Sequence, residues 1–501
     1  MFGQSLSTAL TLRWTTLLAS VPVLATAALL IWIFYTLSLH TLAKYPGPRL
    51  AAITRLWYVR QLKKGKYPTL SRELHRTYGP ILRIAPNEIS FGDPKAGHTI
   101  YNTKTKFPKS DFYSAWSVKN FDTHEEKLFS DVDEVHAGNR RKLLQLTYAM
   151  SSVLEAESYI DQYTELLLER FGELAEKGED FNLVWWLEMY AMDVIGDLFF
   201  GRSFGHLEAG GDAHGWLASI ATFVRFITVH ASLPSELRPL HGLWQALTNK
   251  AFRGSMGTTA SIRDTSVKRG NERQSIIDEG KSAPRKDLLA KFMELQKEKQ
   301  RSDWQLPDIQ QEGFVALFAG SDTTAIAMSS IMHGLMANAD AMSNVLKELR
   351  DALFNGTITL PIRYSDSIKL PYMSACIKEG FRIHTSTGVN MARIVPLGGA
   401  EIAGHWFPGD TRVGCNSHAT HFDKEVFGQD ADEFVPERWL KADAANMEIA
   451  LAEIHKLLPH LLLKFDLQLL DPKAPLISDG QWFDKPLNII VKARRPTSKQ
   501  A

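Results

Sequence analysis

Long stretches in which apolar residues recur every three to four positions are separated by short stretches in which apolar and polar residues alternate. The first pattern is typical of amphipathic or buried helices, and the second is typical of half-buried strands. Because the long stretches dominate, the pattern predicts a mainly α fold with small β-sheets. The principal expected helices span residues 68–79, 159–174, 183–200, 311–336 and 371–383, and the first expected strands span residues 81–84 and 88–91.

The stretch Gln311–Met336 predicts a helix at the centre of the fold. Asp308 is suited to cap its first turn, with Gln311 at the reciprocal capping-box position and Pro307 keeping the preceding chain out of the helix. Apolar residues cover almost its whole circumference, as expected of a helix buried in a large core. Its middle, Ala319-Gly320-Ser321-Asp322-Thr323-Thr324, breaks this pattern, because an interior glycine costs about 1 kcal/mol and a buried acid needs partners.

Two interpretations of this polar centre stay open. In the first, it is an ordinary core helix whose glycine allows close packing and whose hydroxyl groups bond back to their own backbone. In the second, the helix borders a groove in which a ligand lies, and Asp322 and Thr323 are placed to move protons through water.

The amino-terminal region contains an uncharged apolar run, Leu17–Leu39, which is long enough to cross a bilayer. A cleaved signal peptide is the alternative, but the run continues well past the possible cleavage site at Ala25-Thr26-Ala27, and its length fits an anchor better. We therefore expect an amino-terminal tail over residues 1–16, one transmembrane helix over residues 17–39 and a proline-rich hinge over residues 40–50. The folded body then covers residues 51–501.

Composition narrows the possible functions. The 501 residues carry a net charge of +1, which gives no electrostatic argument for nucleic-acid binding. Two cysteines, Cys376 and Cys415, exclude a disulfide framework and a four-cysteine metal site. The stretch over residues 220–240 is apolar and aromatic. Residues 263–285 are polar and are expected to form an exposed connector.

Three motifs follow one another along the chain. They are the Ala319–Thr324 sequence, the Glu379-Gly380-Phe381-Arg382 sequence and the Pro436-Glu437-Arg438-Trp439 sequence. Together with residues 78–93, which are similar to the first sheet of fungal members, they resemble the cytochromes P450, the haem-thiolate monooxygenases. In that family the first motif activates oxygen, which would give Asp322 and Thr323 a catalytic role in moving protons.

The resemblance implies a cytochrome P450-like fold, a haem cofactor, an NADPH-cytochrome P450 reductase as electron donor and an apolar small-molecule substrate. It also implies a single-pass protein of the endoplasmic reticulum membrane whose body faces the cytosol. By analogy, fungal secondary-metabolite biosynthesis is the expected setting.

The resemblance further assigns roles to six side chains. Glu379, Arg382 and Arg438 would form a buried structural triad. The haem propionates would be contacted by His136 and Arg140, which stand four apart on one helix face, and by Arg393. The alternative is that His136, Arg140 and Arg393 are ordinary solvated basic side chains.

The resemblance breaks between about residues 440 and 450. The family has a Phe-x-x-Gly-x-Arg-x-Cys-x-Gly loop there, whose thiolate is the axial ligand of the haem iron. This chain passes from Trp439 through a short stretch to residues that resemble the following helix, so the loop is absent. We expect Cys376 and Cys415 to be small buried residues and His455 and His460 to be packing residues. No metal ligand is therefore assigned.

Two functions stay open. In the first, the chain belongs to a haem-dependent monooxygenase lineage whose active form carries the missing loop. Alternatively, it is a catalytically inactive P450-like membrane protein that binds or scaffolds other molecules. We expect the 501-residue chain as written to do no oxygen chemistry, because it contains no cysteine where the thiolate is needed.

Overall fold

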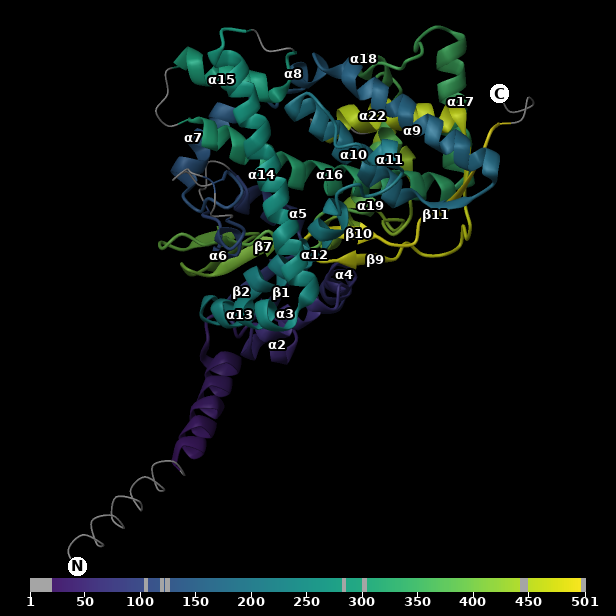
Figure 1. Cartoon of the computed structure of the whole chain (residues 1–501). Helices are drawn as coiled ribbons and strands as arrows, with labels where there is room; N and C mark the ends of the chain where they lie inside the picture. The colour runs from purple at the N-terminus through teal and green to yellow at the C-terminus, as the bar shows by residue number, and fades with distance from the viewer. Residues whose placement is uncertain are drawn as a thin grey trace, which may run out of the picture.

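The computed structural model describes residues 20–102, 107–117, 121, 127–281, 285–299, 304–441 and 449–496. It consists of a mainly helical body from which one helix projects (Figure 1). The expected tail over residues 1–16 and the missing-loop region over residues 442–448 lie outside the described residues.

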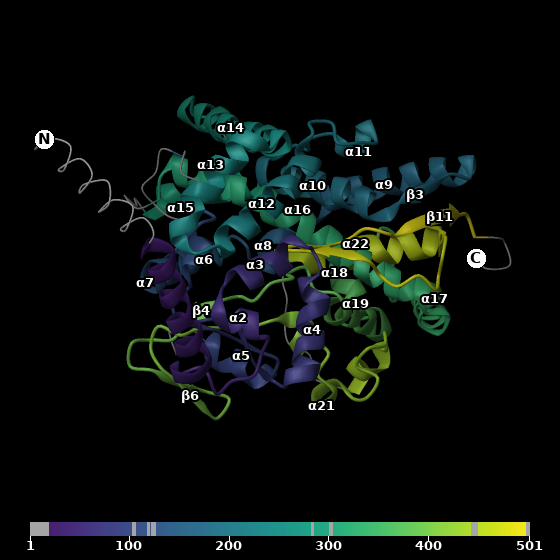
Figure 2. The same ribbon diagram turned by 90° about the horizontal axis from the view of Figure 1, so that it is seen from below.

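Two helices in the described part of the chain are long and apolar enough to cross a membrane. One of them, Leu306–Ala337, is 72% buried and is the core helix of the body. The other, Ser20–Leu39, is 6% buried and leaves the body near the amino terminus (Figures 1 and 2). Its 20 residues span about 30 Å, the thickness of the hydrocarbon core of a bilayer. It is thus a candidate transmembrane helix, and we call it the anchor.

The anchor is fastened to the body by two hydrogen bonds. The indole nitrogen of Trp32 donates to the carbonyl oxygen of Ile53 at 2.9 Å. The buried guanidinium of Arg83 donates to the carbonyl oxygen of Thr36 at 2.7 Å, and its other donors bind the carbonyl of Pro86. The last part of the anchor, η1 (Tyr35–Leu39), therefore has a fixed position relative to the body.

The strands form small sheets, as the alternating pattern predicts. The largest among the described residues has the order β1-β2-β7-β4, with β1 and β2 antiparallel and β2 and β7 parallel. The first two strands confirm the expected pair. The strand bounds are β1 Ile81–Ala85, β2 Glu88–Phe91, β3 Asp180–Asn182, β4 Arg393–Ile394, β5 Ala400–Ile402, β6 His405–Phe407, β7 Arg412–Cys415, β8 Asp466–Leu469, β9 Ser478–Gly480, β10 Asp484–Pro486 and β11 Ile490–Arg494.

Helix α16 (Leu306–Ala337) lies at the centre of the body. It packs against α10 (Leu183–Phe200), α14 (Lys250–Asp278), α19 (Pro371–Ile383) and α22 (Ile449–Lys464). Glycines allow the closest approaches. A Cβ atom at Gly313 would lie 2.7 Å from the ring of Phe200, and one at Gly380 would lie 2.3 Å from Ile331. The core is thus built by helices that enclose α16.

The remaining helices surround this core. Their bounds are α2 Arg49–Ile53, α3 Leu56–Lys63, α4 Tyr67–Tyr78, α5 Pro94–Ile100, α6 Asp111–Ser114, α7 Glu134–Leu144, α8 Met150–Leu154, α9 Glu157–Lys177, α11 His206–Ala209, α12 Trp216–Ser232, η2 Ser235–Leu237, α13 Arg238–Thr248, α15 Leu288–Lys299, α17 Ala339–Phe354, α18 Tyr364–Ser367, α20 Ser417–Thr420, α21 Lys424–Phe427 and η3 Pro436–Lys441.

Two local expectations were wrong. Most of the expected connector over residues 263–285 belongs to the 29-residue helix α14. Its small and polar residues pack closely: Ser266 donates to the carbonyl of Gln310 at 2.6 Å, and a Cβ atom at Gly270 would meet the side chain of Gln310. The start of α16 also differs, because Gln305 is the N-cap and Asp308 is its capping-box partner, which places Pro307 inside the first turn.

Candidate functional site

One face of α16 is open at its middle, although the helix is otherwise deeply buried. Ala319 is exposed, and Val315 and Thr323, one turn to either side, are half-buried. Residues four apart lie on the same helix face, so these three positions form one solvent-accessible strip of α16. The Thr323 hydroxyl donates to the carbonyl of Ala319 at 2.6 Å. The structure therefore shows one feature of each interpretation of the polar centre: a hydroxyl bonded to its own helix backbone, and an open helix face.

Asp322 lies on another side of α16, in a buried cluster with Glu188 of α10 and Lys485 of β10. Lys485 forms an ion pair with Glu188, whose side chain is fully buried. Burial raises the pKa of Glu188 to about 8 despite the opposing effect of Lys485, and burial also raises the pKa of Asp322. Burial disfavours charged Lys485, but the two carboxyl groups outweigh it and raise the pKa of the ammonium group. The cluster can therefore hold a proton on a carboxyl group near neutral pH.

A small cavity of about 50 Å³ connects this cluster with the periphery. Asp322 and Lys485 line it together with Arg225 of α12 and Asp479 of β9. Arg225 and Asp479 form an ion pair, and the Arg225 side chain is 59% exposed. The cavity has room for a few water molecules and polar walls to bind them. Asp322 thus has a polar route outward that does not use the open face of α16.

The three expected triad residues meet around one buried carboxylate. Arg382 donates to both oxygens of Glu379, at 2.7 and 2.8 Å, and Arg438 donates to one of them at 3.1 Å. Trp439 donates to the second oxygen at 2.8 Å, and the backbone N–H of Val435 donates to the first at 2.8 Å. Despite burial, these donors hold the pKa of Glu379 below its ordinary value. The triad joins α19 to η3.

His136 and Arg393 contact carboxyl groups of the protein. Arg393 donates to Glu134 at 2.5 Å, and His136 Nδ1 lies 2.5 Å from an oxygen of Asp131. The expected helix is present as α7, but His136 is at its outer side with 40% of the side chain exposed. The Nε atom of Arg393 is buried and has no hydrogen-bond partner in the described structure.

Arg140 faces α16 from the next turn of α7. Its guanidinium lies 3.7 Å from Asp308 and 3.9 Å from Glu312, and it stacks over the ring of Trp304 at 4.4 Å. Within the described structure its Nε and Nη2 atoms are buried without a hydrogen-bond partner. Burial raises the pKa of Glu312 to about 7, against the effect of Arg140. Arg140 and Arg393 therefore have unused donors, which suit the carboxylates of a haem.

The two thiols do not suit the iron side of a haem. Cys376 lies on α19 near Glu348 of α17 and Glu437 of η3, and burial raises the pKa of its thiol. Cys415 ends β7 beside Tyr101, and burial raises the pKa of its thiol to about 12. Both are buried neutral residues, as expected, and the neighbours named here belong to elements other than α16. The sequence has no further cysteine, so the donor set lacks the thiolate.

The expected packing histidines of α22 bind the protein. His455 Nδ1 lies 3.0 Å from the hydroxyl of Ser367, and His460 Nε2 accepts from the backbone of Ile362 at 3.1 Å. Glu453 on the same helix is buried, and burial alone raises its pKa to about 8. Sequence reasoning did not single out Glu453, Glu188 or Lys485.

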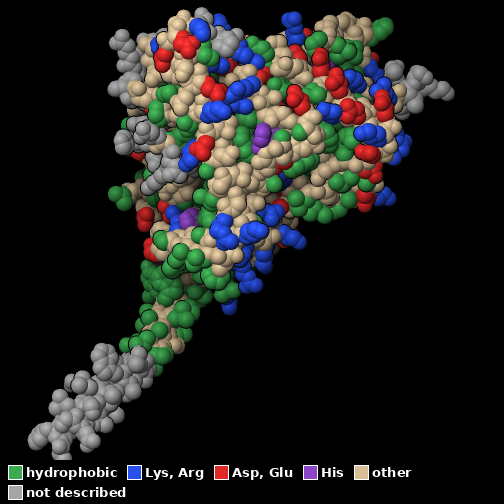
Figure 3. Space-filling view, viewed as in Figure 1, with side chains coloured by type: hydrophobic (Ala, Val, Ile, Leu, Met, Phe, Trp, Pro, Cys, Tyr) green, Lys and Arg blue, Asp and Glu red, His purple; other side chains and the backbone are tan. Residues whose placement is uncertain are grey.

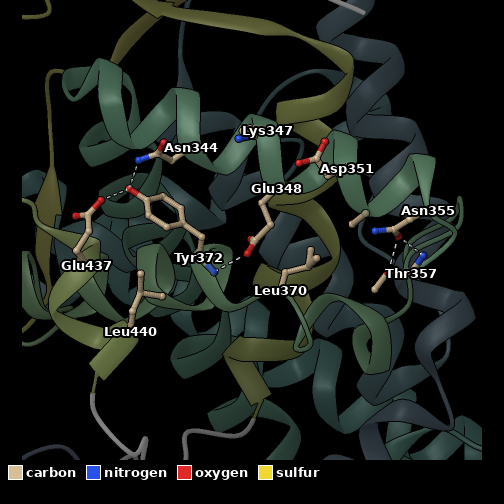
Figure 4. A pocket seen from close by; sticks show the side chains of 11 residues that line it. Asn344, Lys347, Glu348, Asp351, Asn355, Thr357, Leu370, Tyr372, Glu437 and Leu440 are labelled. Carbon is tan, nitrogen blue, oxygen red and sulfur yellow. Dashed lines mark hydrogen bonds between the residues drawn. The ribbon is translucent and has the colours of Figure 1, made fainter.

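A broad groove of about 620 Å³ lies between α17, α19 and η3 (Figure 4). Several of its polar groups bind one another or nearby backbone. Tyr372 donates to Glu437 at 2.6 Å and accepts from Asn344 at 3.3 Å, while Glu348 accepts from the backbone N–H groups of Tyr372 and Met373. Glu348 thereby caps the start of α19. These bonds support α19, the helix that carries Glu379 and Arg382.

Comparisons with known proteins agree with this architecture. The sequence profile of the cytochrome P450 family matches residues 46–493. The chain is 35% identical to cytochrome P450 monooxygenase gsfF of Penicillium aethiopicum, over 92% of this chain and 95% of that protein. It is 29% identical to pisatin demethylase of Fusarium vanettenii, over 95% of each chain, and 29% identical to cytochrome P450 monooxygenase cicH of Emericella nidulans, over 91% of this chain.

These matches support a P450 monooxygenase and do not favour the inactive binding protein. The family implies haem as the cofactor, a redox partner that supplies electrons and a small-molecule substrate. With a profile match over most of the chain and relatives that it covers almost completely, this protein belongs to the cytochrome P450 family.

Proposed function

We propose that the protein is a membrane-anchored monooxygenase that oxidises an apolar small molecule in fungal secondary metabolism, with electrons from an NADPH-cytochrome P450 reductase. The observation that carries the proposal is the open face of α16 at Ala319 and Thr323, beside the buried acid Asp322. The relatives named as monooxygenases and as pisatin demethylase support an oxidation of this kind. The anchor supports a location on a membrane, for which we propose the endoplasmic reticulum with the body in the cytosol.

The residues of this chain have three roles in the proposed function: holding the haem carboxylates, supplying protons and supporting the fold. Arg140 and Arg393 use their free donors to hold the carboxylates of the haem, and His136 lies on the same helix as Arg140. Asp322 stores a proton in the cluster with Glu188 and Lys485 and receives it through the small polar cavity. Thr323 carries a hydroxyl at the open face. The triad of Glu379, Arg382 and Arg438 is structural, since every group in it is bound within the protein.

An apolar substrate is supported by a second cavity, of about 600 Å³, between α3, α12, α13 and α14. Its walls include the apolar side chains of Phe226, Val229, Leu233, Trp244 and Phe252. Polar side chains such as Arg225, His241 and Gln481 line the rest of this cavity, so it suits a largely apolar molecule that carries a few polar groups.

A haem-thiolate enzyme would need a cysteine that this chain lacks near residues 440–450. We propose that the catalytically competent product of this gene contains an additional in-frame segment between Trp439 and Ile449, with the cysteine that this chain lacks. The triad and α22 on either side are intact. Such a segment would lie between η3 and α22, which both have the expected structure.

Two measurements test the proposal. Transcripts sequenced across codons 439–449 should include a form with the extra segment, whereas an uninterrupted join in every transcript contradicts it. In parallel, the 501-residue chain should give no thiolate-type carbon monoxide difference spectrum, and the chain with a relative's loop inserted should give one. A normal spectrum from the unmodified chain contradicts our account of the ligand.

A further inference from the structure

The cavity between α3, α12, α13 and α14 carries two cations, and none of the described residues that line it is an Asp or Glu. The cations are Lys63 of α3 and Arg225 of α12, and both side chains are exposed, so they lie where the cavity meets solvent. Figure 3 shows a group of Lys and Arg side chains over the part of the body where Figure 1 places α3 and α12. The mouth of this cavity therefore has a positive potential.

One carboxylate fixes the two cations relative to each other. Asp479 of β9 forms an ion pair with Arg225. A Cβ atom at Gly65, two residues after Lys63, would collide with an oxygen of the same carboxylate, and the backbone N–H of Gly480 donates to the carbonyl of Gly65 at 2.6 Å. The chain after α3 is thus fastened to β9 beside Arg225. One carboxylate next to two cations leaves a net positive charge.

Aromatic rings form the side of the cavity that α12, α13 and α14 provide. The ring of Phe226 stacks on that of His241, with centres 5.3 Å apart and planes at 9°, and its centre lies 4.0 Å from that of Phe252. Burial, and after it the charge of Lys63, lowers the pKa of His241, so this imidazole is neutral at physiological pH. The wall therefore offers flat, uncharged rings on which an aromatic ligand can stack.

A buried amide separates this cavity from the small cavity at Asp322. Arg225 and Gln481 line both cavities. Gln481 is 6% exposed, and its side-chain oxygen has no hydrogen-bond partner in the described structure. The neighbouring backbone N–H of Trp482 donates to the hydroxyl of Thr228 at 3.3 Å, which holds this segment against α12. A ligand that reaches the shared wall therefore meets a guanidinium group and a free acceptor.

We propose that this cavity binds the negatively charged group of an aromatic substrate, with Arg225 as the residue that selects for the charge and Lys63 as a second cation beside it. The inference rests on the proposed function and deepens it, because it names the substrate class: a largely apolar aromatic molecule that carries a carboxylate or another singly negative group. The planar guanidinium of Arg225 suits a carboxylate, which would compete with Asp479 for its donors. The ring of the substrate would lie against Phe226 and His241.

Two probes that differ only in charge test this inference in the full-length chain. 2-Naphthoate and 2-naphthamide have the same rings and nearly the same shape, but only the first carries a negative charge. Both are titrated by calorimetry into the protein in nanodiscs of phosphatidylcholine, with empty nanodiscs as the blank. We expect the wild type to bind 2-naphthoate about tenfold more tightly than 2-naphthamide. Phe226→Leu should weaken both probes, because it removes the ring on which they stack.

Charge variants locate the selecting residues. Arg225→Met and Lys63→Met should each reduce the preference for 2-naphthoate and leave the affinity for 2-naphthamide unchanged, which also shows that the cavity is intact. Asp479→Asn should strengthen 2-naphthoate binding, because it removes the carboxylate that competes for Arg225. Arg60→Met and Lys64→Met are the matched controls, since both remove exposed cations near the cavity that do not line it, and both should keep the preference.

The possible outcomes separate this inference from the proposed function. Equal affinity of the wild type for the two probes overturns the charge selection, while an apolar substrate stands. A preference that survives Arg225→Met places the anion elsewhere and also overturns it. Where Arg225→Met weakens both probes alike, Asp479→Asn decides, and an unchanged affinity for 2-naphthoate in that variant overturns the inference. If neither probe binds, the cavity fails as a substrate pocket too, whereas the carbon monoxide spectrum tests the haem chemistry independently.

Discussion

Arg382 donates two parallel hydrogen bonds to the carboxylate of Glu379, and both side chains are almost completely buried. The remaining guanidinium donors of Arg382 bind the carbonyls of His421, Ala431 and Glu433. Arg382 therefore joins α19 to two later segments of the chain, ahead of residues 440–450, where the family's cysteine loop would be expected.

Glu379→Gln should destabilise the protein strongly, because it leaves the buried guanidinium of Arg382 without its counter-charge. Removing one partner of a buried ion pair costs about 3 to 5 kcal/mol. The pKa of Glu379 is held below its ordinary value, so its stabilising effect is present at neutral pH and is lost as pH falls through that lowered pKa. Denaturant unfolding should show a much lower unfolding free energy for the variant than for the wild type at pH 7. The difference between the two should be smaller in acid. Equal stability at pH 7 would contradict the role of the triad.

Gly380→Ala should also destabilise the protein, for steric reasons. The added methyl group would lie 2.3 Å from Cγ1 and 2.9 Å from Cα of Ile331, and the second of these is a backbone atom. Overpacking of this kind costs about 1 to 3 kcal/mol. Gly138→Ala on α7 is the matched control, since nothing lies within 4 Å of its Cβ position. Thermal unfolding should show a lower Tm for the first variant and an unchanged or higher Tm for the second.

Glu188→Gln should flatten the dependence of stability on pH. In the folded protein the pKa of Glu188 is raised from 4.5 to about 8. Between these values the unfolded chain releases the proton and the folded chain retains it, so the wild type should lose stability as pH rises from about 5 to 8. Asp322 and Lys485 face the same group, and Arg225 and Asp479 close the cavity beside them. The unfolding free energy of the variant should fall less steeply with pH across this range than that of the wild type. The control variant Glu165→Gln, which alters an exposed side chain, should behave like the wild type.

Lys485→Met should keep the two acids protonated to higher pH. The ammonium group opposes the rise in pKa of both Glu188 and Asp322, so its removal lets burial raise both values further. The infrared band of buried protonated carboxyl groups should therefore persist to higher pH than in the wild type. Lys473→Met, at an exposed position, should leave the band unchanged. A band that disappears at lower pH in Lys485→Met would refute the proposed cluster.

Much of the fold could be predicted from local patterns. The helix over 371–383 agrees with α19 at both ends, and the strands over 81–84 and 88–91 are present because alternation and the turn between them are local signals. Helix α14 was missed because its inward residues, such as Ser266 and Gly270, are small and not hydrophobic. That segment is helical because it packs closely against α16, and no hydrophobic periodicity in the sequence indicates this contact.

The candidate site was only partly predictable. Asp322 was found from its motif, but its partners Glu188 and Lys485 are almost 300 residues apart in sequence, and a buried ion pair at such a separation leaves no local pattern. The spacing of His136 and Arg140 predicted a shared helix, but the contacts of each side chain depend on how α7 packs against α16 and on the acids that happen to face it.

The hydrogen bonds from Trp32 to Ile53 and from Arg83 to Thr36 have a further consequence. They hold the anchor at a fixed angle to the body, so in the proposed membrane location every copy would have the same tilt. The reductase proposed above would therefore always approach the same side of the molecule. Cutting these two bonds should leave the protein attached but randomly oriented, which would slow its encounters with that reductase.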